Sequence, residues 1–230
     1  MRVKNTSIIS DLWSHPVEIA RSNFKHKSLS CWSMNTTVGC SHGCRFCYVP
    51  SVTGIFQRTA LAEYGVQDPD LDWGAYAFLR PWDEKKFRAS LRSAERTPVS
   101  KLNSDGHRAV MLSTTTDAYQ VIRNPDPAKQ KELNTAHRQM VRRALELILS
   151  ESTLNVRILT RSPWAREDFD LFKEFGHRLT FGMSLPTLRD DWRKVHEPKA
   201  PSVAKRLETL RAAKEAGLHV YVAVAPTYPE

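Results

Sequence analysis

Short apolar runs alternate with amphipathic segments from residue 107 to the end of the chain. Four of these runs are rich in Val, Ile, Leu or Phe, which is the composition of strands that are buried on both faces. A shorter run precedes a cluster of cysteines and has the same character. We therefore predict strands at Cys31–Thr37, His107–Thr114, Leu154–Thr160, Arg178–Leu185 and Leu218–Pro226.

The segments between these runs have the spacing of helices. Pro127–Ser150 follows an Asn-Pro-Asp-Pro start and carries one apolar stripe at a period of about 3.6 residues. That stripe consists of Leu133, Met140, Ala144 and Leu147. A second helix is expected at Ala165–Phe175, where Phe169 and Phe172 would face the core.

A third helix is predicted at Ser202–Ala216, with Ser202 as its N-cap and Gly217 as the residue that ends it. Its expected apolar face is Val203, Leu207 and Leu210. Alternation of strands and helices is typical of a parallel sheet with right-handed crossovers, so we expect an α/β protein. Five strands do not close an eight-stranded barrel, and we predict an open, partial parallel β/α barrel.

The division of the chain follows from where this alternation starts. We expect an N-terminal extension over residues 1–30 and the partial barrel over 31–230, with an elaborated connection at 54–105. Within that connection, Asp83–Glu95 has the pattern of a basic helix. The chain stops directly after the last predicted strand. We expect either that the sequence is truncated and lacks a further C-terminal part, or that another element covers that edge.

Composition excludes several classes of protein. The chain has 230 residues, of which 41% are hydrophobic and 26% charged, so it is not a disordered or fibrous chain. No apolar run approaches the roughly 20 residues of a membrane-spanning helix, and the first residues lack the apolar core of a secretory signal. Four cysteines are too few for a disulfide scaffold of this length. We expect a cytoplasmic protein without a membrane partner.

The net charge of +9 is concentrated in one stretch. Residues 85–143 carry 13 Lys and Arg against 5 Asp and Glu. Such a surplus favours nucleic acid as a partner, because clustered cations bind phosphate backbones. Arg88, Arg92 and Arg96 would share one helix face in that interaction. The alternative is a solvated basic surface that binds nothing.

The segment with the clearest chemistry is the C-x3-C-x2-C motif of Cys40, Cys44 and Cys47. Gly39 and Gly43 allow its backbone to fold around a bulky inorganic centre. Three thiolates are one fewer than an ordinary 4Fe–4S cluster uses, so one iron would be open to another ligand. The alternative is structural zinc with His42 or a distant histidine as fourth ligand, although the chain has no second cysteine hook.

This motif, with Phe46 before its last cysteine, resembles the radical S-adenosylmethionine (SAM) superfamily. Later segments resemble its spore photoproduct lyase-like branch in the same order: STTTDAYQ at 113–120, LTRS at 159–162, HEP at 196–198 and VAP at 224–226. The resemblance implies a 4Fe–4S cluster and SAM as cofactors. It also implies reductive cleavage of SAM to a 5′-deoxyadenosyl radical that abstracts hydrogen from a substrate, with flavodoxin or ferredoxin as electron donor.

The resemblance also assigns residues to these cofactors. Cys40, Cys44 and Cys47 match the cluster ligands. The residues that match SAM contacts are Phe46 and Tyr48 at the adenine, Thr116 at the methionyl end, Ser184 at the ribose, Arg161 where the family often has lysine, and Ala225 near the adenine. Alternatively, the Thr-rich strand end forms an ordinary turn and Arg161 neutralises a local carboxylate.

One position departs from the branch. Spore photoproduct lyases have a hydrogen-donating cysteine where this chain has Thr114. An O–H bond is much stronger than an S–H bond, so threonine does not replace that donor. Cys31 is expected to be a small buried residue, His42 a hydrogen-bonding residue of the loop, and Asp117 either a site carboxylate or a helix cap.

Two readings of the substrate follow. The basic charge and the resemblance favour a nucleic acid in DNA repair or modification, whereas the missing donor cysteine favours tailoring of a peptide or a small molecule. A zinc-stabilised nucleic-acid-binding module is the non-enzymatic alternative.

Overall fold

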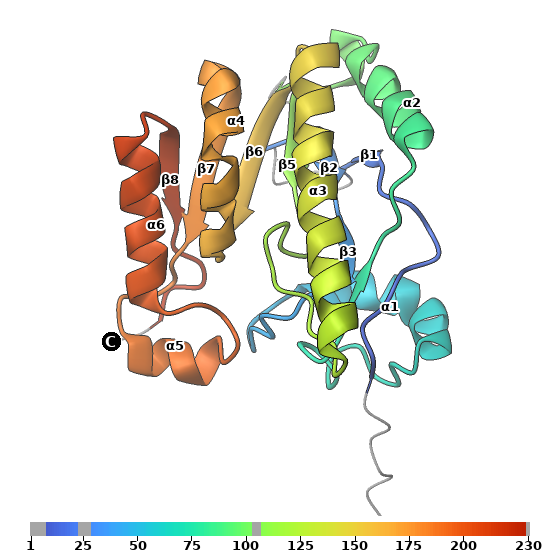
Figure 1. The fold of residues 1–230 in the computed structure, drawn as a ribbon, viewed down its shortest axis with the longest axis vertical. Coiled ribbons are helices and arrows are strands. Elements are labelled where there is room, and N and C mark those ends of the chain that lie inside the picture. The colour runs from blue at the N-terminus through green and yellow to red at the C-terminus, as the bar shows by residue number, and fades with distance from the viewer. Residues whose placement is uncertain (1–7, 23–28, 103–106, 229–230) are drawn as a thin grey trace, which may run out of the picture.

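The main sheet has six strands, five of them parallel (Figure 1). The computed structural model describes residues 8–22, 29–102 and 107–228, with the side chains of 53–55 left aside. The sheet order is β1-β2-β5-β6-β7-β8. Its strands are β1 (Ile19–Arg21), β2 (Trp32–Met34), β5 (Ala109–Leu112), β6 (Asn155–Thr160), β7 (Leu179–Ser184) and β8 (His219–Ala223). All five predicted strands are therefore confirmed as neighbours in one parallel sheet.

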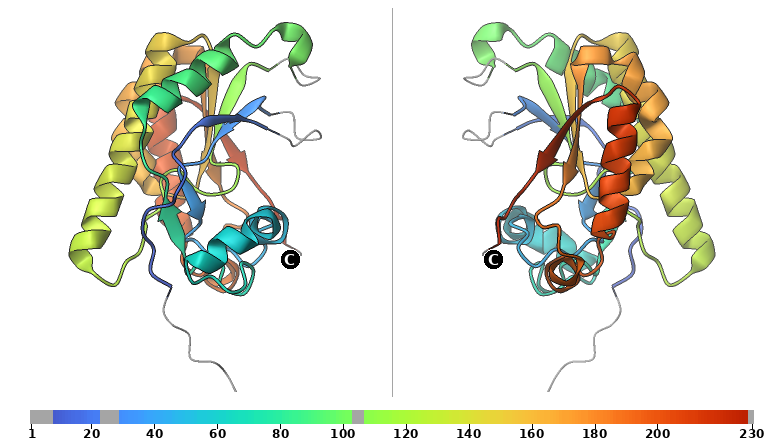
Figure 2. Two further views of the ribbon diagram at one scale, coloured as in Figure 1. Left: turned by 90° about the vertical axis from the view of Figure 1, so that its right-hand side faces the viewer. Right: turned by 90° about the vertical axis from the view of Figure 1, so that its left-hand side faces the viewer.

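Helices cover one face of this sheet (Figures 1 and 2). The helices on that face are α2 (Glu84–Glu95), α3 (Pro127–Glu151), α4 (Phe169–Glu174) and α6 (Val203–Glu215). Two more, α1 (Val49–Glu63) and α5 (Asp190–His196), lie across the carboxyl ends of the strands (Figure 1). The expected α/β partial barrel is thus an open sheet whose strand ends meet α1 and α5.

The predicted helices form with small changes at their ends. The expected stripe of α3 is buried, and Asp126 caps α3 by accepting a hydrogen bond from the backbone N–H of Ala128. The helix expected at Ala165–Phe175 is instead a 3-10 turn (Pro163–Asp168) followed by α4, because Pro163 and the Ser162 cap begin it as a tight turn. Shorter 3-10 turns lie at Val99–Lys101 and Gly176–Arg178. No helix of the described residues is long and apolar enough to cross a bilayer.

The face of α6 differs from the prediction. The buried residues of α6 are Val203, Arg206, Thr209 and Ala213, whereas Leu207 and Leu210 are only half-buried. The two leucines line a groove together with Val222 of β8 and Val224, which follows that strand. They remain half-exposed because β8 is the edge of the sheet, and none of the described strands pairs with its outer side.

The N-terminal region and the first predicted strand also need correction. Residues 8–22, expected as part of an extension, contribute β1, which pairs antiparallel with β2. The strand expected at Cys31–Thr37 stops at Met34, where the chain leaves the main sheet. It continues as β3 (Thr37–Gly39), which pairs with β4 (Ala77–Leu79) in a separate two-stranded sheet.

This small sheet has its own apolar cluster, which consists of Trp13, Val38, Leu61, Val66, Tyr76 and Phe78. The cluster explains why the chain changes sheets. Val38 and Phe78 are paired in register and pack on this second core. The connection over 54–105 is consequently a structured unit that supports the segment before Cys40.

Candidate functional site

The cysteine loop runs from β3 to α1 at the carboxyl ends of the parallel strands. Gly39 and Gly43 have φ of +89° and +58°, a region that side chains rarely adopt. A Cβ on Gly39 would lie 2.4 Å from the ring of Tyr76, and a Cβ on Gly74 would lie 2.6 Å from Cα of Gly43. The backbone of the loop is therefore packed directly against residues 74–76.

The three thiols of the loop fit a metal centre in their chemistry. Cys40 and Cys44 are buried, Cys47 is half-buried, and none forms a disulfide. Burial raises the pKa of Cys44 to about 11, and burial with the charge of Asp117 raises the pKa of Cys40. Metal coordination favours the thiolates and would release these protons. Within the described ranges no three Cys, His, Asp or Glu side chains are placed to hold a metal ion together, so ligation would require the thiols to move closer to one another.

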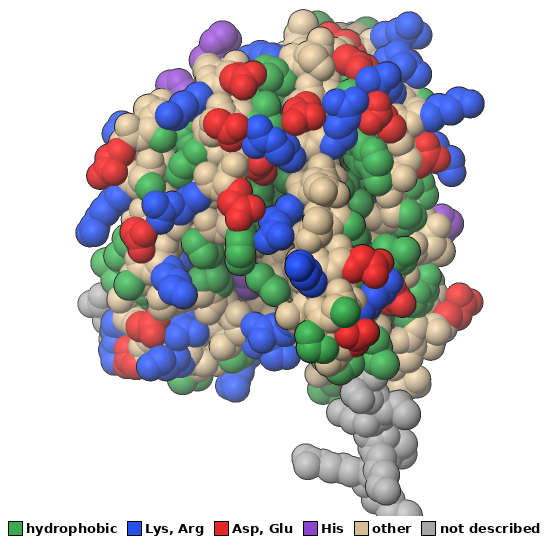
Figure 3. All heavy atoms as spheres, viewed as in Figure 1, with side chains coloured by type: hydrophobic (Ala, Val, Ile, Leu, Met, Phe, Trp, Pro, Cys, Tyr) green, Lys and Arg blue, Asp and Glu red, His purple; other side chains and the backbone are tan. Residues whose placement is uncertain are grey.

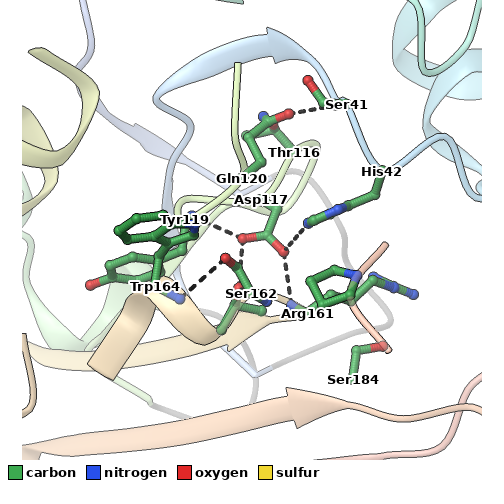
Figure 4. Close-up of polar contacts among 12 residues, drawn as sticks. Ser41, His42, Thr116, Asp117, Tyr119, Gln120, Arg161, Ser162, Trp164 and Ser184 are labelled. Atoms are coloured by element: carbon green, nitrogen blue, oxygen red, sulfur yellow. Dashed lines mark hydrogen bonds and ion pairs between the residues drawn. The ribbon is translucent and has the colours of Figure 1, made fainter. Parts of the chain in front are cut away.

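Asp117 is the centre of the hydrogen bonds that fix this loop (Figure 4). Its carboxylate accepts from Nε2 of His42 at 3.0 Å, from Oγ1 of Thr160 at 2.7 Å and from the backbone N–H groups of Tyr119 and Arg161. Burial opposes its ionisation, but the hydrogen bond and charge of His42 hold the pKa of Asp117 well below its usual range. Asp117 thus joins the cysteine loop to the end of β6, and His42 is a hydrogen-bonding residue of the loop.

A second set of hydrogen bonds connects the loop to the segment after β5. Gln120 accepts from the backbone N–H of Ser41 and donates to Oγ1 of Thr116 at 2.6 Å. Thr116 in turn donates to the carbonyl oxygen of Gly39 at 2.7 Å. Thr116 therefore lies beside the cysteine loop, where a contact with the methionyl end of SAM would require it. Its hydroxyl already forms hydrogen bonds with Gly39 and Gln120.

Arg161 lies next to the loop in an ion pair. Its Nε donates to Oε1 of Glu197 at 2.6 Å, and Oε2 of Glu197 accepts from Nη1 of Arg206 at 2.9 Å. The Arg161 guanidinium carbon is 5.8 Å from the centre of the Phe46 ring. Neutralisation of a local carboxylate, the alternative that the sequence left open, is what Arg161 does in this structure. Both of its terminal nitrogens lack a hydrogen-bond partner among the described residues.

The other predicted SAM contacts differ in their burial and in their hydrogen bonds. Tyr48 donates its hydroxyl to the carbonyl oxygen of Thr114 at 2.8 Å. Ser184 is buried at the end of β7, and its carbonyl oxygen accepts from Arg206. Ala225 is exposed and lies two residues beyond β8. Phe46 and Tyr48 belong to the cysteine loop or directly follow it, and the structure places Arg161 beside Phe46. No contact between Ala225 and the cysteine loop is found among the described residues.

Thr114, at the donor position of the family, is partly buried, and its Oγ1 accepts from Nδ2 of Asn35 at 3.2 Å. Cys31 is fully buried, and its backbone N–H donates to the carbonyl oxygen of Ala109 at the amino end of β5. Cys31 therefore lies at the opposite end of the sheet from the cysteine loop. The predicted buried role of Cys31 agrees with this position.

Seven of the 13 cations in the basic stretch over 85–143 form ion pairs with acidic residues in the part of the chain that the structure describes. Arg88 contacts Glu84 and Glu151, Arg143 contacts Glu84, and Arg142 contacts Asp168 and Asp170. Figure 3 shows the resulting mixture of blue and red side chains over α2, α3 and α4. The cations of the stretch do not form a surface of one sign on this face.

Three residues of the site had no assigned role in the sequence. Gln120 and Glu197 stand inside the motifs that carry the resemblance, but nothing in their spacing indicates contacts with the cysteine loop. Arg206 occupies an inward position of α6 between Val203 and Ala213. An arginine three residues after one apolar position and seven before another is the pattern that could have revealed a buried charge.

The chain belongs to the radical SAM superfamily, whose family model matches residues 34–229. Uncharacterized protein ORF301 of Acidianus two-tailed virus is 34% identical over 200 residues, a region covering 86% of this chain and 56% of that protein. The chain thus spans little more than half of the length of this relative.

Solved structures of spore photoproduct lyase have a similar fold. A single-substitution variant superposes with a TM-score of 0.61 at 15% identity, over 96% of this chain and 52% of that one. A variant with bound AdoMet and dinucleoside spore photoproduct gives 0.57 at 16% identity, over 92% and 51%. These findings confirm the predicted superfamily and partial-barrel fold.

Proposed function

We propose that this chain is the cofactor-binding core of a radical SAM enzyme that cleaves SAM reductively and abstracts hydrogen from a substrate. The observation that carries the proposal is the position of three thiols on one glycine-framed loop, at the strand ends where such a barrel holds its site. The one other thiol of the sequence, Cys31, is buried at the far end of the sheet. Three protein ligands would leave one iron of a four-iron cluster open to SAM.

The chain's own residues bind and orient the cofactors in this proposal. The cluster and SAM, when bound, supply the electron transfer and the 5′-deoxyadenosyl radical. Cys40, Cys44 and Cys47 hold the cluster. Arg161 presents its two terminal nitrogens, which have no hydrogen-bond partner among the described residues and match a carboxylate group. The remaining contacts that we propose for SAM are Phe46, Tyr48, Thr116, Ser184 and Ala225.

Zinc would need a different arrangement of the loop. A structural zinc site has four protein ligands, and the nearest histidine, His42, already donates Nε2 to Asp117. Metal analysis after anaerobic reconstitution separates the two centres. We expect about four iron and four sulfide per chain; one zinc and no iron would support the nucleic-acid-binding module instead.

For the substrate, we propose a nucleic acid in a repair or modification reaction. The net charge of +9 supports this choice, as does the dinucleoside bound by structurally similar lyases. The second candidate is a peptide or a small molecule, which the absence of a thiol at Thr114 favours. Flavodoxin or ferredoxin is the proposed electron donor.

Anaerobic turnover with dithionite and SAM tests the activity. We expect 5′-deoxyadenosine, together with poor conversion of the thymine photoproduct to thymines, because Thr114 returns no hydrogen atom to a product radical. Thr114→Cys should increase clean repair if the pocket is lyase-like. Efficient repair by the natural chain would contradict the role given to Thr114. Cleavage of SAM without repair by either protein would favour the peptide or small-molecule substrate.

A further inference from the structure

Three charged side chains from distant parts of the chain meet beside Cys44. Glu197, which follows α5, lies between Arg161 at the end of β6 and Arg206 on α6. The Arg206 side chain is fully buried and that of Glu197 is 1% exposed. The Arg161 side chain is 20% exposed. Burial of charges such as those of Arg206 and Glu197 is costly unless they pair. Their presence beneath the cysteine loop therefore needs a reason.

Arg206 connects this group to the strand ends. Its Nε donates to the carbonyl oxygen of Pro201, and its Nη1 donates to that of Ser184 as well as to Glu197. Its Nη2 is buried without a hydrogen-bond partner in the described part of the chain. Arg206 therefore fixes one oxygen of Glu197, and the other oxygen fixes Nε of Arg161.

The group carries a net charge of +1, because two guanidinium groups enclose one carboxylate. Oε1 of Glu197 lies 3.9 Å from Sγ of Cys44. A negative charge at this distance disfavours addition of an electron to a centre held by Cys44, and positive charges favour it. Net charge and burial around the sulfurs are among the factors that set cluster potentials.

We propose that Glu197 and Arg206 are positioning residues that hold Arg161 beside the cysteine loop, and that the charge of the three together sets the reduction potential of the bound cluster. The inference rests on the proposed function, since it requires a cluster at Cys44. It assigns roles to two residues that lie 153 and 162 positions after Cys44 in the sequence.

The test is a redox titration of the reconstituted protein with dithionite, followed by electron paramagnetic resonance of the reduced cluster. Arg206→Met removes a positive charge and should lower the reduced-to-oxidised ratio at a fixed potential at least tenfold, which is about 59 mV for one electron. Glu197→Gln removes a negative charge with little change in shape and should raise the ratio at least tenfold. The double variant restores the net charge and should lie within about threefold of the unsubstituted protein.

Glu208→Gln is the matched control, because Glu208 is on the same helix and pairs with Arg166 but is 67% exposed. Glu208→Gln should leave the reduced-to-oxidised ratio of the cluster unchanged. Arg206→Lys keeps the positive charge and should therefore give a ratio close to that of the unsubstituted protein. A purely structural role would not shift the reduction potential in opposite directions in Arg206→Met and Glu197→Gln. If Arg206→Met does not fold, Glu197→Gln decides alone.

A cluster whose potential stays the same in Glu197→Gln, or moves in the same direction in both single variants, overturns the inference and leaves the proposed function intact. An unsubstituted protein that takes up no iron and sulfide overturns the proposed function, and the inference fails with it. Iron and sulfide content therefore distinguishes the two failures.

Discussion

Arginine–carboxylate contacts occur in two regions of this molecule with opposite surroundings. Beside the cysteine loop, Glu197 and Arg206 are buried and make several hydrogen bonds each. Over α2, α3 and α4, pairs such as Arg143–Glu84 and Arg142–Asp170 have side chains that are 36% to 61% exposed. The same residue types therefore stand in a low-dielectric setting in one region and in water in the other.

The difference in burial changes what each contact is worth. An exposed pair contributes about 0–1 kcal/mol, because water screens the charges and the side chains lose entropy. Removal of one partner from a buried pair costs about 3–5 kcal/mol, because the other charge stays buried and uncompensated. We expect the surface pairs to be replaceable and the buried set to control the site. The following predictions test this contrast.

The largest effect is expected from the thiol beside the buried set. Cys44→Ala removes one of three ligands and should abolish the visible absorbance of the cluster and all formation of 5′-deoxyadenosine. Cys31→Ala is the control, since that thiol lies at the other end of the sheet, and should retain both. A cluster that survives in Cys44→Ala would show that the ligands are assigned wrongly.

A large loss of stability is expected from Asp117→Asn. The amide puts an N–H group where the carboxylate accepts four hydrogen bonds, so unfolding of the metal-free protein in urea should require about 3–5 kcal/mol less. Asp170→Asn is the surface counterpart, because Arg142 keeps its ion pair with Asp168 in that variant. This substitution should lower the free energy of unfolding by about 0–1 kcal/mol. Equal losses in the two variants would remove the distinction between the regions.

His137 should give the buried region a pH dependence. Its Nε2 shares a hydrogen bond of 2.8 Å with Oγ1 of Thr36, and burial lowers its pKa to about 4. The unfolded chain binds this proton near pH 6.5 and the folded chain only near 4, so stability is full above 6.5 and falls as the pH drops between them.

The lowered pKa of His137 corresponds to a loss of about 3 kcal/mol in the free energy of unfolding at low pH. Urea unfolding at pH 7.5 and pH 4.5 measures it, and His137→Gln should remove this part of the pH dependence. His219→Gln, at an exposed position of β8, should leave it intact. The assignment to His137 is lost if the two variants show the same pH profile.

The smallest effect is expected on the surface, in DNA binding. Arg88 already contacts Glu84 and Glu151, whereas Arg92 and Arg96 are exposed and form no ion pair within the described residues. Arg92→Ala and Arg96→Ala should each reduce the slope of log K against log salt by about one, and Arg88→Ala by clearly less. A binding constant that does not respond to salt would leave the basic stretch as a solvated surface.

The sequence predicted the features that depend on local pattern. The cysteine spacing, the five parallel strands and the stripe of α3 all involve neighbouring residues, and periodicity or motif spacing reveals them. The strands β1, β3 and β4 have three residues each, too few for an alternating pattern to be visible. The division of Cys31–Thr37 between two sheets could not be predicted for the same reason.

Contacts across the fold were outside the reach of these patterns. The resemblance indicates Arg161 but not its partner Glu197, which stands 36 residues away. The spacing of Val203, Arg206 and Ala213 places Arg206 on the inward face of α6, but it does not identify the acceptors of the buried guanidinium group. Those acceptors are the carbonyl oxygens of Pro201 and Ser184 and the carboxylate of Glu197. Tertiary placement decides these roles.

The contact between Gly43 and Gly74 has a consequence for how this chain tolerates mutation. The two residues belong to loops 31 positions apart, and each has a positive φ. A side chain on Gly74 would meet the backbone of the cysteine loop, so enlarging one residue cannot be compensated by shrinking the other, which is already glycine. In a library that replaces every residue in turn, we expect both positions to accept glycine alone. A screen for cluster colour would then identify position 74 as readily as the cysteines themselves.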